Sequence, residues 1–323
     1  MKALVLTGRE RFELVERELA VPGEHEVTVR VVAAAICRTD AKMWQSGHRD
    51  LVMPRVLGHE VCGAIDEAPG RLFAVWPGSV CGSCSMCLSG RENLCPEMHI
   101  TGFHRDGGFS ERLVAPRSSL VEVPKGVGAT LAALAEPLAC AIHGVKQSCA
   151  RRADRVLIYG AGTLGILLAV AAINRGASVT LTDPDEAKLA RSAGFRSRYA
   201  IDATAPGSRD RFDLVFNATA SADTLASGIR HLEPGGRFCL FSGLGDVPEN
   251  PASIFSELHY RELELVGSYG CTREDMRDAL RLLARYGHDL GFLIEQTISL
   301  EEVPAFISKV LAGTGFRQVI EFQ

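Results

Sequence analysis

The stretch Val156-Leu-Ile-Tyr-Gly160-Ala-Gly162-Thr-Leu-Gly165 decides the fold of this chain. It places the spacing Gly-x-Gly-x-x-Gly between an apolar strand and a predicted helix over 165–174. In that setting Gly160 permits a tight turn, Gly162 lets a pyrophosphate approach the backbone, and Gly165 lets the helix pack closely on the strand. The helix N-terminus adds unpaired N–H groups and a partial positive charge. The motif therefore predicts a dinucleotide-binding loop that contains Gly160, Gly162, Thr163, Leu164 and Gly165.

An acidic residue follows this loop at the distance that such a fold requires. A second apolar strand, Val179–Thr182, ends at Asp183, 18 residues after Gly165. A carboxylate there accepts hydrogen bonds from the adenosine ribose hydroxyls and repels a 2′-phosphate, which favours NAD over NADP. The alternative is that Asp183 caps the next helix, which we expect to begin near Pro184. Both roles can hold at once.

Strands and helices alternate through the rest of this half of the chain. The expected strands are Val156–Tyr159, Val179–Asp183, Leu214–Asn217, Phe238–Gly243 and Leu263–Ser268. Helices are expected over Gly165–Asn174 and Glu186–Ala193. This alternation predicts a doubly wound parallel sheet with helices on both faces, an α/β fold. The uncharged run Val156–Ile173 approaches the length of a membrane span, but its glycines favour a buried strand and helix.

The two ends of the chain have a different pattern. The first third is rich in strands and turns, with strands expected over Leu4–Leu6, Phe12–Val15, Val27–Val32 and Ser110–Ala115. After Gly270 we expect two helices and a final strand, over Arg273–Tyr286, Glu301–Ala312 and Gln318–Phe322. A length of 323 residues fits two domains.

Composition limits the partners and the compartment. Lysine and arginine number 35 against 39 acidic residues, so the net charge of −4 gives no bulk attraction to nucleic acid or a membrane surface. The N-terminal apolar run is only Ala3–Leu6, too short for a secretory signal. We therefore expect a cytoplasmic protein, and clustered cysteines in that reducing compartment more often bind metal than form disulfides.

Four of the ten cysteines form one compact motif. Cys81, Cys84, Cys87 and Cys95 have the spacing C-x2-C-x2-C-x7-C, which can close a tetrahedral structural zinc site. An iron–sulfur cluster is the rival, because Cys95-Pro96 follows a C-x2-C-x2-C run, but the last gap is seven residues rather than three. Unliganded thiols are a third alternative. The cysteines without partners at ligand spacing are interpreted as packing residues: Cys62, Cys140, Cys149, Cys239 and Cys271. His143 is interpreted as a core histidine.

A second set of possible ligands is dispersed. Cys37 follows a strand, His59 comes 22 residues later, and Glu136 precedes Pro137. Each alone has an ordinary explanation, as a small buried residue, a satisfied histidine and an acid at a helix start. Together they supply one sulfur, one nitrogen and one oxygen. Three protein ligands and an open position are the arrangement of a catalytic zinc.

These motifs, in this order, resemble one family along essentially the whole chain. They are Cys37-Arg-Thr-Asp40, Gly58-His-Glu60, the four-cysteine loop, Asp106-Gly-Gly-Phe109, Glu136-Pro-Leu-Ala, Gly160–Gly165 and Thr314-Gly-Phe-Arg-Gln-Val-Ile-Glu-Phe322. The family is the zinc-containing medium-chain dehydrogenases/reductases, which include alcohol, sorbitol and threonine dehydrogenases. The resemblance implies a β-rich GroES-like catalytic domain over 1–138, an inserted Rossmann domain over 139–269, and a return to the catalytic domain over 270–323.

The resemblance also implies the parts of the site. Cys37, His59 and Glu136 would coordinate the catalytic zinc, with Glu60 as an outer or exchanging ligand. Arg38 and Arg317 match positions that face the cofactor pyrophosphate, and Lys188 matches a residue that contacts the ribose. Zinc would act as a Lewis acid on a substrate hydroxyl, the Thr39 hydroxyl would carry the proton away, and hydride would pass to NAD.

The expected enzyme therefore holds two zinc ions and NAD, and acts on a secondary alcohol, polyol or sugar-like small molecule. The Glu136-Pro137 pair resembles the polyol and threonine dehydrogenases. We expect a homodimer or homotetramer that binds neither nucleic acid nor membrane. The alternative is a non-catalytic or NADP-linked member of the same superfamily.

The chain departs from the family pattern in a few places. Lys42 stands where the family usually has the histidine at the outer end of a proton relay, and a solvated side chain is the favoured interpretation. The segment between His59 and Cys81 is short and lacks the usual Val-Gly-Asp-Arg-Val. Trp44 and Phe103 either line a substrate pocket or pack in the core. A cluster of polar groups could bind a substrate anion or simply be surface charge: Arg49, Arg55, His104 and Arg105.

Overall fold

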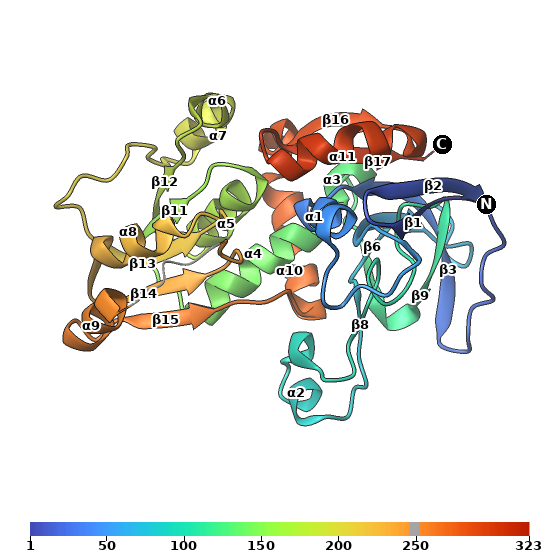
Figure 1. Cartoon of the computed structure of the whole chain (residues 1–323), viewed down its shortest axis with the longest axis horizontal. Coiled ribbons are helices and arrows are strands. Elements are labelled where there is room, and N and C mark those ends of the chain that lie inside the picture. The colour runs from blue at the N-terminus through green and yellow to red at the C-terminus, as the bar shows by residue number, and fades with distance from the viewer. Residues whose placement is uncertain (246–251, 323) are drawn as a thin grey trace. The chain divides into compact units, whose positions relative to one another are not determined.

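The computed structural model describes residues 1–245 and 252–322 and is drawn in Figure 1. The chain forms two compact units. The two-segment unit consists of Met1–Ala139 and Cys271–Gln323, and the inserted unit is Cys140–Gly270. Helix α4 (Ala135–Gln147) carries the chain from the first segment into the inserted unit.

The inserted unit is built on one parallel sheet. Its strands are β11 (Arg155–Tyr159), β12 (Ser178–Thr182), β13 (Phe212–Asn217), β14 (Leu232–Leu240) and β15 (Glu264–Gly267). They lie in the order β12-β11-β13-β14-β15, as the parallel arrows of Figure 1 show. The helices between them are α5 (Thr163–Asn174), α6 (Glu186–Arg191), α7 (Ala193–Arg198), α8 (Asp223–His231) and α9 (Ala252–Tyr260).

This topology confirms the doubly wound fold. From β11 the chain moves through α5 to β12 on one side, whereas from β13 it moves through α8 to β14 on the other. Because such crossovers are right-handed, α5 and α8 cover opposite faces of the sheet. Leu157, Val215 and Phe238 have no exposed surface and form part of the core against α8. A single parallel bridge between Thr180 and Asp202 extends the sheet beyond β12.

The helix after Asp183 differs from the prediction. The expected helix Glu186–Ala193 is divided into α6 and α7 at Ser192. Its cap is Asp185, whose Oδ1 accepts hydrogen bonds from the backbone N–H groups of Ala187 (3.0 Å) and Lys188 (3.3 Å). The interpretation of Asp183 as the cap is therefore wrong, because the helix begins two residues later than Pro184.

The two-segment unit is mainly antiparallel. One sheet has the order β10-β6-β5-β3-β17-β16, with β9 also paired to β3, and a smaller sheet has the order β2-β1-β4. The strands of the larger sheet are β3 (Glu26–Ala35), β5 (Glu60–Ala64), β6 (Phe73–Val75), β9 (Arg112–Pro116), β10 (Leu120–Glu122), β16 (Ile294–Ile298) and β17 (Arg317–Glu321). The smaller sheet has β1 (Lys2–Gly8), β2 (Arg11–Glu16) and β4 (Arg55–Val56).

The last strand closes the larger sheet of this unit. β17 pairs antiparallel with β3, with Val319 opposite Ala35, and parallel with β16, with Val319 opposite Thr297. The C-terminal segment thus completes a sheet begun near the N-terminus. The remaining elements of the unit are the pair β7 (Gly78–Ser79) and β8 (His99–Ile100) and the helices α1 (Arg38–Ser46), α2 (Ser85–Leu88), α3 (Ala129–Ala132), α10 (Arg273–Tyr286) and α11 (Val303–Ala312).

Helix α10 has the bounds that the sequence predicts. Thr272 caps it: the Thr272 Oγ1 accepts from the Asp275 N–H (3.2 Å), and the Asp275 carboxylate accepts from the Thr272 N–H (2.9 Å). The first residue of the helix, Arg273, donates its backbone N–H to Glu92 Oε1 at 2.6 Å. Glu92 lies in the cysteine-rich loop, so that loop is tied to the start of α10.

Among the described residues, no helix is both long enough and apolar enough to cross a membrane. The uncharged run Val156–Ile173 is divided between strand β11 and the 12-residue helix α5.

Candidate metal and cofactor sites

Cys37 is fixed at the start of helix α1. It is the N-cap residue, and its Sγ accepts the Thr39 N–H at 3.4 Å. Asp40 completes the capping box by accepting the Cys37 N–H at 2.8 Å. The capping box thus fixes the Cys37 thiol at the start of the helix.

Asp40 also positions His59. Its carboxylate is fully buried, accepts the Gly58 N–H at 3.3 Å, and lies 3.3 Å from the Nδ1 atom of His59. Gly58 has a φ of +96°, and the ring of Phe109 fills the space that a side chain would need there. A carboxylate behind a histidine fixes the orientation of the ring and raises its basicity. Sequence reasoning assigned no role to Asp40, although its capping-box spacing from Cys37 was visible.

The structure brings Cys37, His59 and Glu60 together. Their ligand atoms all lie within 4.8 Å of one another, and His59 and Glu60 are buried. The Glu60 Oε1 accepts a hydrogen bond from Nη2 of Arg317 at 2.5 Å. The other oxygen, Oε2, is buried and has no hydrogen-bond partner among the described residues. A buried carboxylate oxygen without a partner is costly unless another ligand satisfies it.

The charged groups of this cluster shift one another's pKa values. Burial raises the pKa of the Cys37 thiol, but Arg317 and His59 outweigh it and bring the pKa to about 7. Burial lowers the pKa of His59, but Asp40 and Cys37 more than offset it, so that pKa is raised well above its usual range. A cysteine sulfur, an imidazole nitrogen and a carboxylate oxygen this close together are a donor set that a divalent metal ion fits.

Two other predicted residues lie near this cluster. Glu136 is in the first turn of α4 and is not one of the three clustered residues, but its charge helps raise the pKa of Glu60, after burial. Its carboxylate lies within 4.8 Å of the Cys271 thiol, so the interpretation of Cys271 as a cysteine without neighbours at ligand spacing is wrong. Thr39 is half-buried in the first turn of α1.

The four clustered cysteines converge on one point. The Sγ–Sγ distances are 3.5 Å for Cys84–Cys87, 3.6 Å for Cys81–Cys95, 3.9 Å for Cys84–Cys95 and 4.0 Å for Cys81–Cys87. A tetrahedron with Zn–S bonds of about 2.3 Å has edges of about 3.8 Å. The thiol set therefore fits a closed zinc site without rearrangement. Helix α2 helps to build it, because Cys84 is its N-cap.

The glycine loop has the geometry that its three glycines suggest. Gly160 has a φ of +111°, which other residues rarely adopt. A Cβ on Gly165 would collide with the carbonyl oxygen of Gly160, whereas a Cβ on Gly162 would meet no atom within 4 Å. The loop is thus tight where it packs on the sheet and open where a phosphate would approach.

Asp183 is fixed against this loop. Its Oδ2 accepts the Ala161 N–H at 2.7 Å and its Oδ1 accepts the Asp185 N–H at 2.9 Å. The carboxylate therefore lies at the carboxyl ends of β11 and β12, beside the open side of the loop. Lys188 lies in α6, with its Nζ 4.0 Å from Asp185. Arg38, by contrast, is exposed and donates its Nε hydrogen to the Leu311 carbonyl at 3.0 Å.

Comparisons with known proteins agree with these sites. Residues 23–125 match the alcohol dehydrogenase GroES-like domain, and residues 163–285 match the zinc-binding dehydrogenase domain. The chain is 32% identical over 305 residues to L-galactonate-5-dehydrogenase of Escherichia coli, covering 87% of each chain. It is 30% identical over 342 residues to sorbitol dehydrogenase of Halalkalibacterium halodurans, covering 99% of each. The chain belongs to the zinc-containing medium-chain dehydrogenase/reductase family.

Solved structures of medium-chain dehydrogenases match the whole chain. A zinc-binding dehydrogenase from Sinorhizobium meliloti, bound to NADP, has a TM-score of 0.88 at 28% identity and covers 99% of both chains. Acetophenone reductase from Geotrichum candidum, in complex with NAD, has a TM-score of 0.87 at 25% identity and covers 99% of this chain and 97% of its own. Relatives of this fold thus use either nicotinamide cofactor.

The polar residues around Phe103 are largely committed to partners within this medium-chain dehydrogenase. Arg55 bonds to Asp106 Oδ1 at 2.9 Å, and Arg105 pairs with Glu26. Arg49 is mostly exposed beside Asp50. These pairs favour structural and surface charge over an anion site built from those arginines. Phe103 is buried in the core, and Trp44 packs partly buried against it.

Cys62, Cys239 and His143 are buried, whereas Cys149 is exposed. Cys62 and Cys239 are buried, and burial raises the pKa of the Cys62 thiol to about 12 and that of Cys239 to about 11. His143 is also buried. Cys149 is exposed at a turn with a φ of +48°, so its interpretation as a packing residue is wrong.

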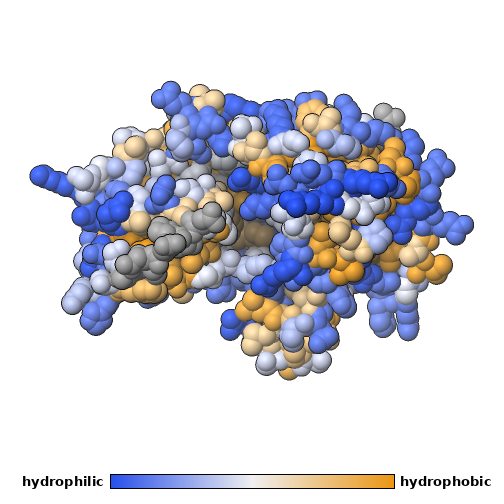
Figure 2. Space-filling view, viewed as in Figure 1, coloured by the Kyte–Doolittle hydropathy of each residue, from blue (hydrophilic) through white to orange (hydrophobic). Residues whose placement is uncertain are grey.

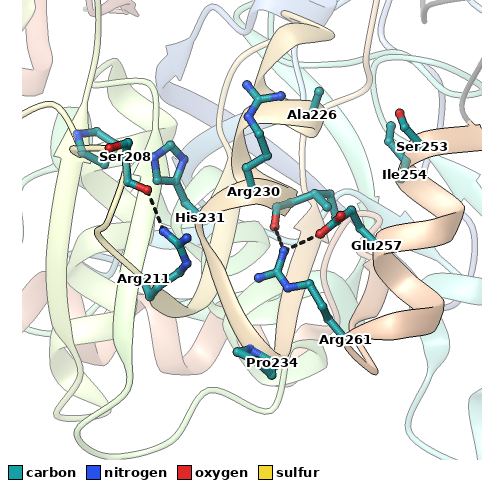
Figure 3. A pocket seen from close by; sticks show the side chains of 12 residues that line it. Ser208, Arg211, Ala226, Arg230, His231, Pro234, Ser253, Ile254, Glu257 and Arg261 are labelled. Carbon is teal, nitrogen blue, oxygen red and sulfur yellow. Dashed lines mark hydrogen bonds and ion pairs between the residues drawn. The ribbon is translucent and has the colours of Figure 1, made fainter.

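A hollow in the inserted unit lies away from the glycine loop. Figure 3 shows its lining, which includes Arg211, His231, Glu257 and Arg261. Arg211 donates to the Ser208 carbonyl at 2.9 Å, and Arg261 to Glu257 at 2.8 Å. These residues adjoin the beginnings of β13 and β14, at the opposite end of the sheet from Gly160. The hollow contains none of the predicted site residues.

Proposed function

We propose that this protein transfers hydride between the carbinol carbon of a secondary alcohol, polyol or sugar-like substrate and NAD. The observation that carries the proposal is the buried cluster of Cys37, His59 and Glu60, with ligand atoms within 4.8 Å of one another. The named relatives act on polyhydroxylated compounds: L-galactonate and sorbitol. We propose residues 139–269 as the NAD-binding domain, with 1–138 and 270–323 forming the catalytic domain.

We further propose how the residues divide the work. Cys37, His59 and Glu136 would hold a catalytic zinc, and Glu60 would exchange with them or stand behind them. Zinc in such a site supplies a Lewis acid that polarises a hydroxyl and lowers its pKa. Asp40 orients His59, and Arg317 balances the charge of Glu60. The Thr39 hydroxyl would accept the substrate proton, while exposed Lys42 remains a solvated side chain.

NAD is the proposed cofactor, held by Gly160, Gly162, Thr163, Leu164 and Gly165, with Asp183 and Lys188 at the ribose. The support is the Asp183 carboxylate, which is fixed beside the loop by the Ala161 N–H. A negative charge there repels the 2′-phosphate of NADP. Arg38 and Arg317 would face the pyrophosphate. Replacing Asp183 with serine should move the preference toward NADP.

We propose that the protein assembles as a homodimer or homotetramer. β15 is an edge strand of the parallel sheet, and exposed edges can pair with another chain. Large apolar side chains are exposed on and beside it: Phe255, Tyr260, Leu265 and Tyr269. Figure 2 shows apolar surface over α9 and β15. A cytoplasmic location is proposed with this, because thiolate zinc ligands stay reduced there.

Elemental analysis and a cofactor-linked assay test the proposal together. We expect two zinc ions per chain and NADH formation with a panel of secondary alcohols and polyols. The matched pair His59→Ala and His25→Ala should separate the site from a general effect, because His25 is exposed and is not one of the clustered residues. A protein that holds two zinc ions but reduces neither NAD nor NADP with any alcohol would support the non-catalytic alternative. Activity with NADP alone would support the NADP-linked alternative.

A further inference from the structure

A histidine that the mechanism does not use lies next to the metal cluster. His48 follows helix α1, and its ring meets the ring of Phe103 edge-on, with centroids 5.3 Å apart. Phe103 in turn meets His59 edge-on at 5.4 Å. The buried phenyl ring therefore contacts two imidazoles, that of His59 and that of the exposed His48, which has 31% of its side-chain surface accessible.

A backbone hydrogen bond selects the tautomer of His48. The Asp50 N–H donates to Nδ1 of His48 at 3.2 Å. A ring nitrogen that accepts a hydrogen bond carries no proton, so the neutral ring carries its proton on Nε2, an assignment that follows from this bond. Burial lowers the pKa of His48, with Asp50 opposing and Arg49, His59 and Lys42 adding to the decrease. His48 is thus a neutral donor at neutral pH.

The Nε2–H donor has no acceptor among the described residues, because the hydrogen bond of this ring uses Nδ1. Asp50 lies behind the ring, with its Oδ2 3.7 Å from Nδ1, and its negative charge disfavours an anionic ligand at His48. Of the neighbouring cations, Arg49 lies beside Asp50, Arg55 and Arg105 are paired with carboxylates, and Lys42 is exposed to solvent. The chemistry that fits a neutral, partly accessible donor in this setting is a hydroxyl oxygen.

We propose that His48 is a specificity-determining residue, whose Nε2–H binds a second hydroxyl of the substrate. This inference rests on the proposed function, in which the first hydroxyl lies at the Cys37–His59 cluster. Phe103 contacts both imidazoles and supplies an apolar surface beside the two positions. The substrate class is therefore a polyol with at least one more hydroxyl near the oxidised carbon, in preference to a simple secondary alcohol or an acid anion.

Two substrates that differ by one hydroxyl, butane-2,3-diol and butan-2-ol, test this. In the wild type the diol should have the higher kcat/KM. His48→Leu keeps an apolar side chain against Phe103 but removes the donor, and should lower kcat/KM for the diol about tenfold, through KM, as expected for a lost neutral hydrogen bond. For butan-2-ol the change should stay within about twofold. His48→Gln, which restores an N–H donor, should recover most of the loss.

The control is His288→Leu, because His288 is 57% exposed and should leave both substrates unchanged. Equal losses on both substrates, or no loss on the diol, would overturn the inference. NMR titration of the zinc-loaded protein with each alcohol, without cofactor, measures how tightly each alcohol binds and so tests the same hydrogen bond without turnover. If neither alcohol is oxidised, the proposed function fails, while tighter diol binding by wild type than by His48→Leu still supports the role of His48. Equal binding by the two proteins would refute it.

Discussion

Asp40 lies behind the metal cluster and contacts it through His59. We predict that Asp40→Asn lowers the affinity for one of two zinc ions by about 10–100-fold, because the ring of His59 loses its orienting carboxylate. Competition with a chromophoric chelator measures the affinity of each ion. Asp66→Asn, an exposed change of the same type, is the control. Loss of both ions, or of neither, would contradict this assignment.

Substituting two glycines of the loop should affect different properties, NAD binding for Gly162 and folding stability for Gly165. Gly162 has an ordinary φ of −76° and open space around it, so Gly162→Ala should fold normally but weaken NAD binding by obstructing the phosphate. Gly165→Ala should destabilise the inserted unit itself, because its Cβ would overlap the Gly160 carbonyl. Calorimetric NAD titration and thermal unfolding together measure both effects. An unchanged NAD affinity in folded Gly162→Ala would disprove the open-approach interpretation.

At the residue scale, the sequence indicates which residues belong to a site more reliably than what each of them contacts there. The spacing of Cys37 and His59 fits a metal set, and the fold brings both beside Glu60. What the sequence could not provide is which acid comes nearest, because Glu60 and Glu136 reach the region from different elements. Asp183 and Asp185 are both acidic and two residues apart, and only backbone geometry decides that Asp185 caps α6.

At the scale of elements, a hydrogen bond from the Arg273 N–H to Glu92 connects the start of helix α10 to the cysteine-rich loop. Glu92→Ala should lower the free energy of unfolding by about 1 kcal/mol, because the Arg273 N–H at the helix start loses its acceptor. Denaturant unfolding measures the change, and Glu97→Ala, an exposed residue of the same loop, is the control. We also expect Glu92→Ala to leave the zinc content at two ions. A fall in zinc content would show that Glu92 supports the thiol site rather than the helix.

Helices and strands were predicted correctly where one local sequence feature, such as a helix cap or an apolar run, marks them clearly. Helix α10 begins at Arg273 and ends at Tyr286 as expected, because Thr272 and Asp275 mark its start and Gly287 its end. Strands β11 and β13 were found because buried parallel strands are nearly uninterrupted apolar runs. The predicted strand Phe238–Gly243 is only partly right, because β14 begins at Leu232 and ends at Leu240. Helix α4 was not among the predicted helices, although one interpretation of Glu136 was an acid at a helix start, and proline is tolerated in a first turn. The division of α6 from α7 at Ser192 has no equally clear sequence signal.

At the scale of the whole molecule, the two units should respond to different ligands. We predict that chelation of zinc lowers the melting temperature of the two-segment unit, which holds all four clustered cysteines, Cys37 and His59. NAD should raise the melting temperature of the inserted unit, which holds Gly160–Gly165, by mass action. Scanning calorimetry with and without each ligand resolves the two effects. A shift of both transitions by chelator alone would show that the units unfold together.

The position of β17 has a consequence for how the protein is made. The two-segment unit needs this strand between β3 and β16, and β17 also carries Arg317 to Glu60. During translation, residues 140–270 leave the ribosome as a complete unit while the sheet around β3 still lacks its partner. Because domains generally fold as units during synthesis, we expect the inserted unit to fold before the sheet around β3 is complete. Glu60 obtains the Arg317 guanidinium only with the last strand, so a chain that ends before β17 would fold the inserted unit but leave Glu60 without this partner.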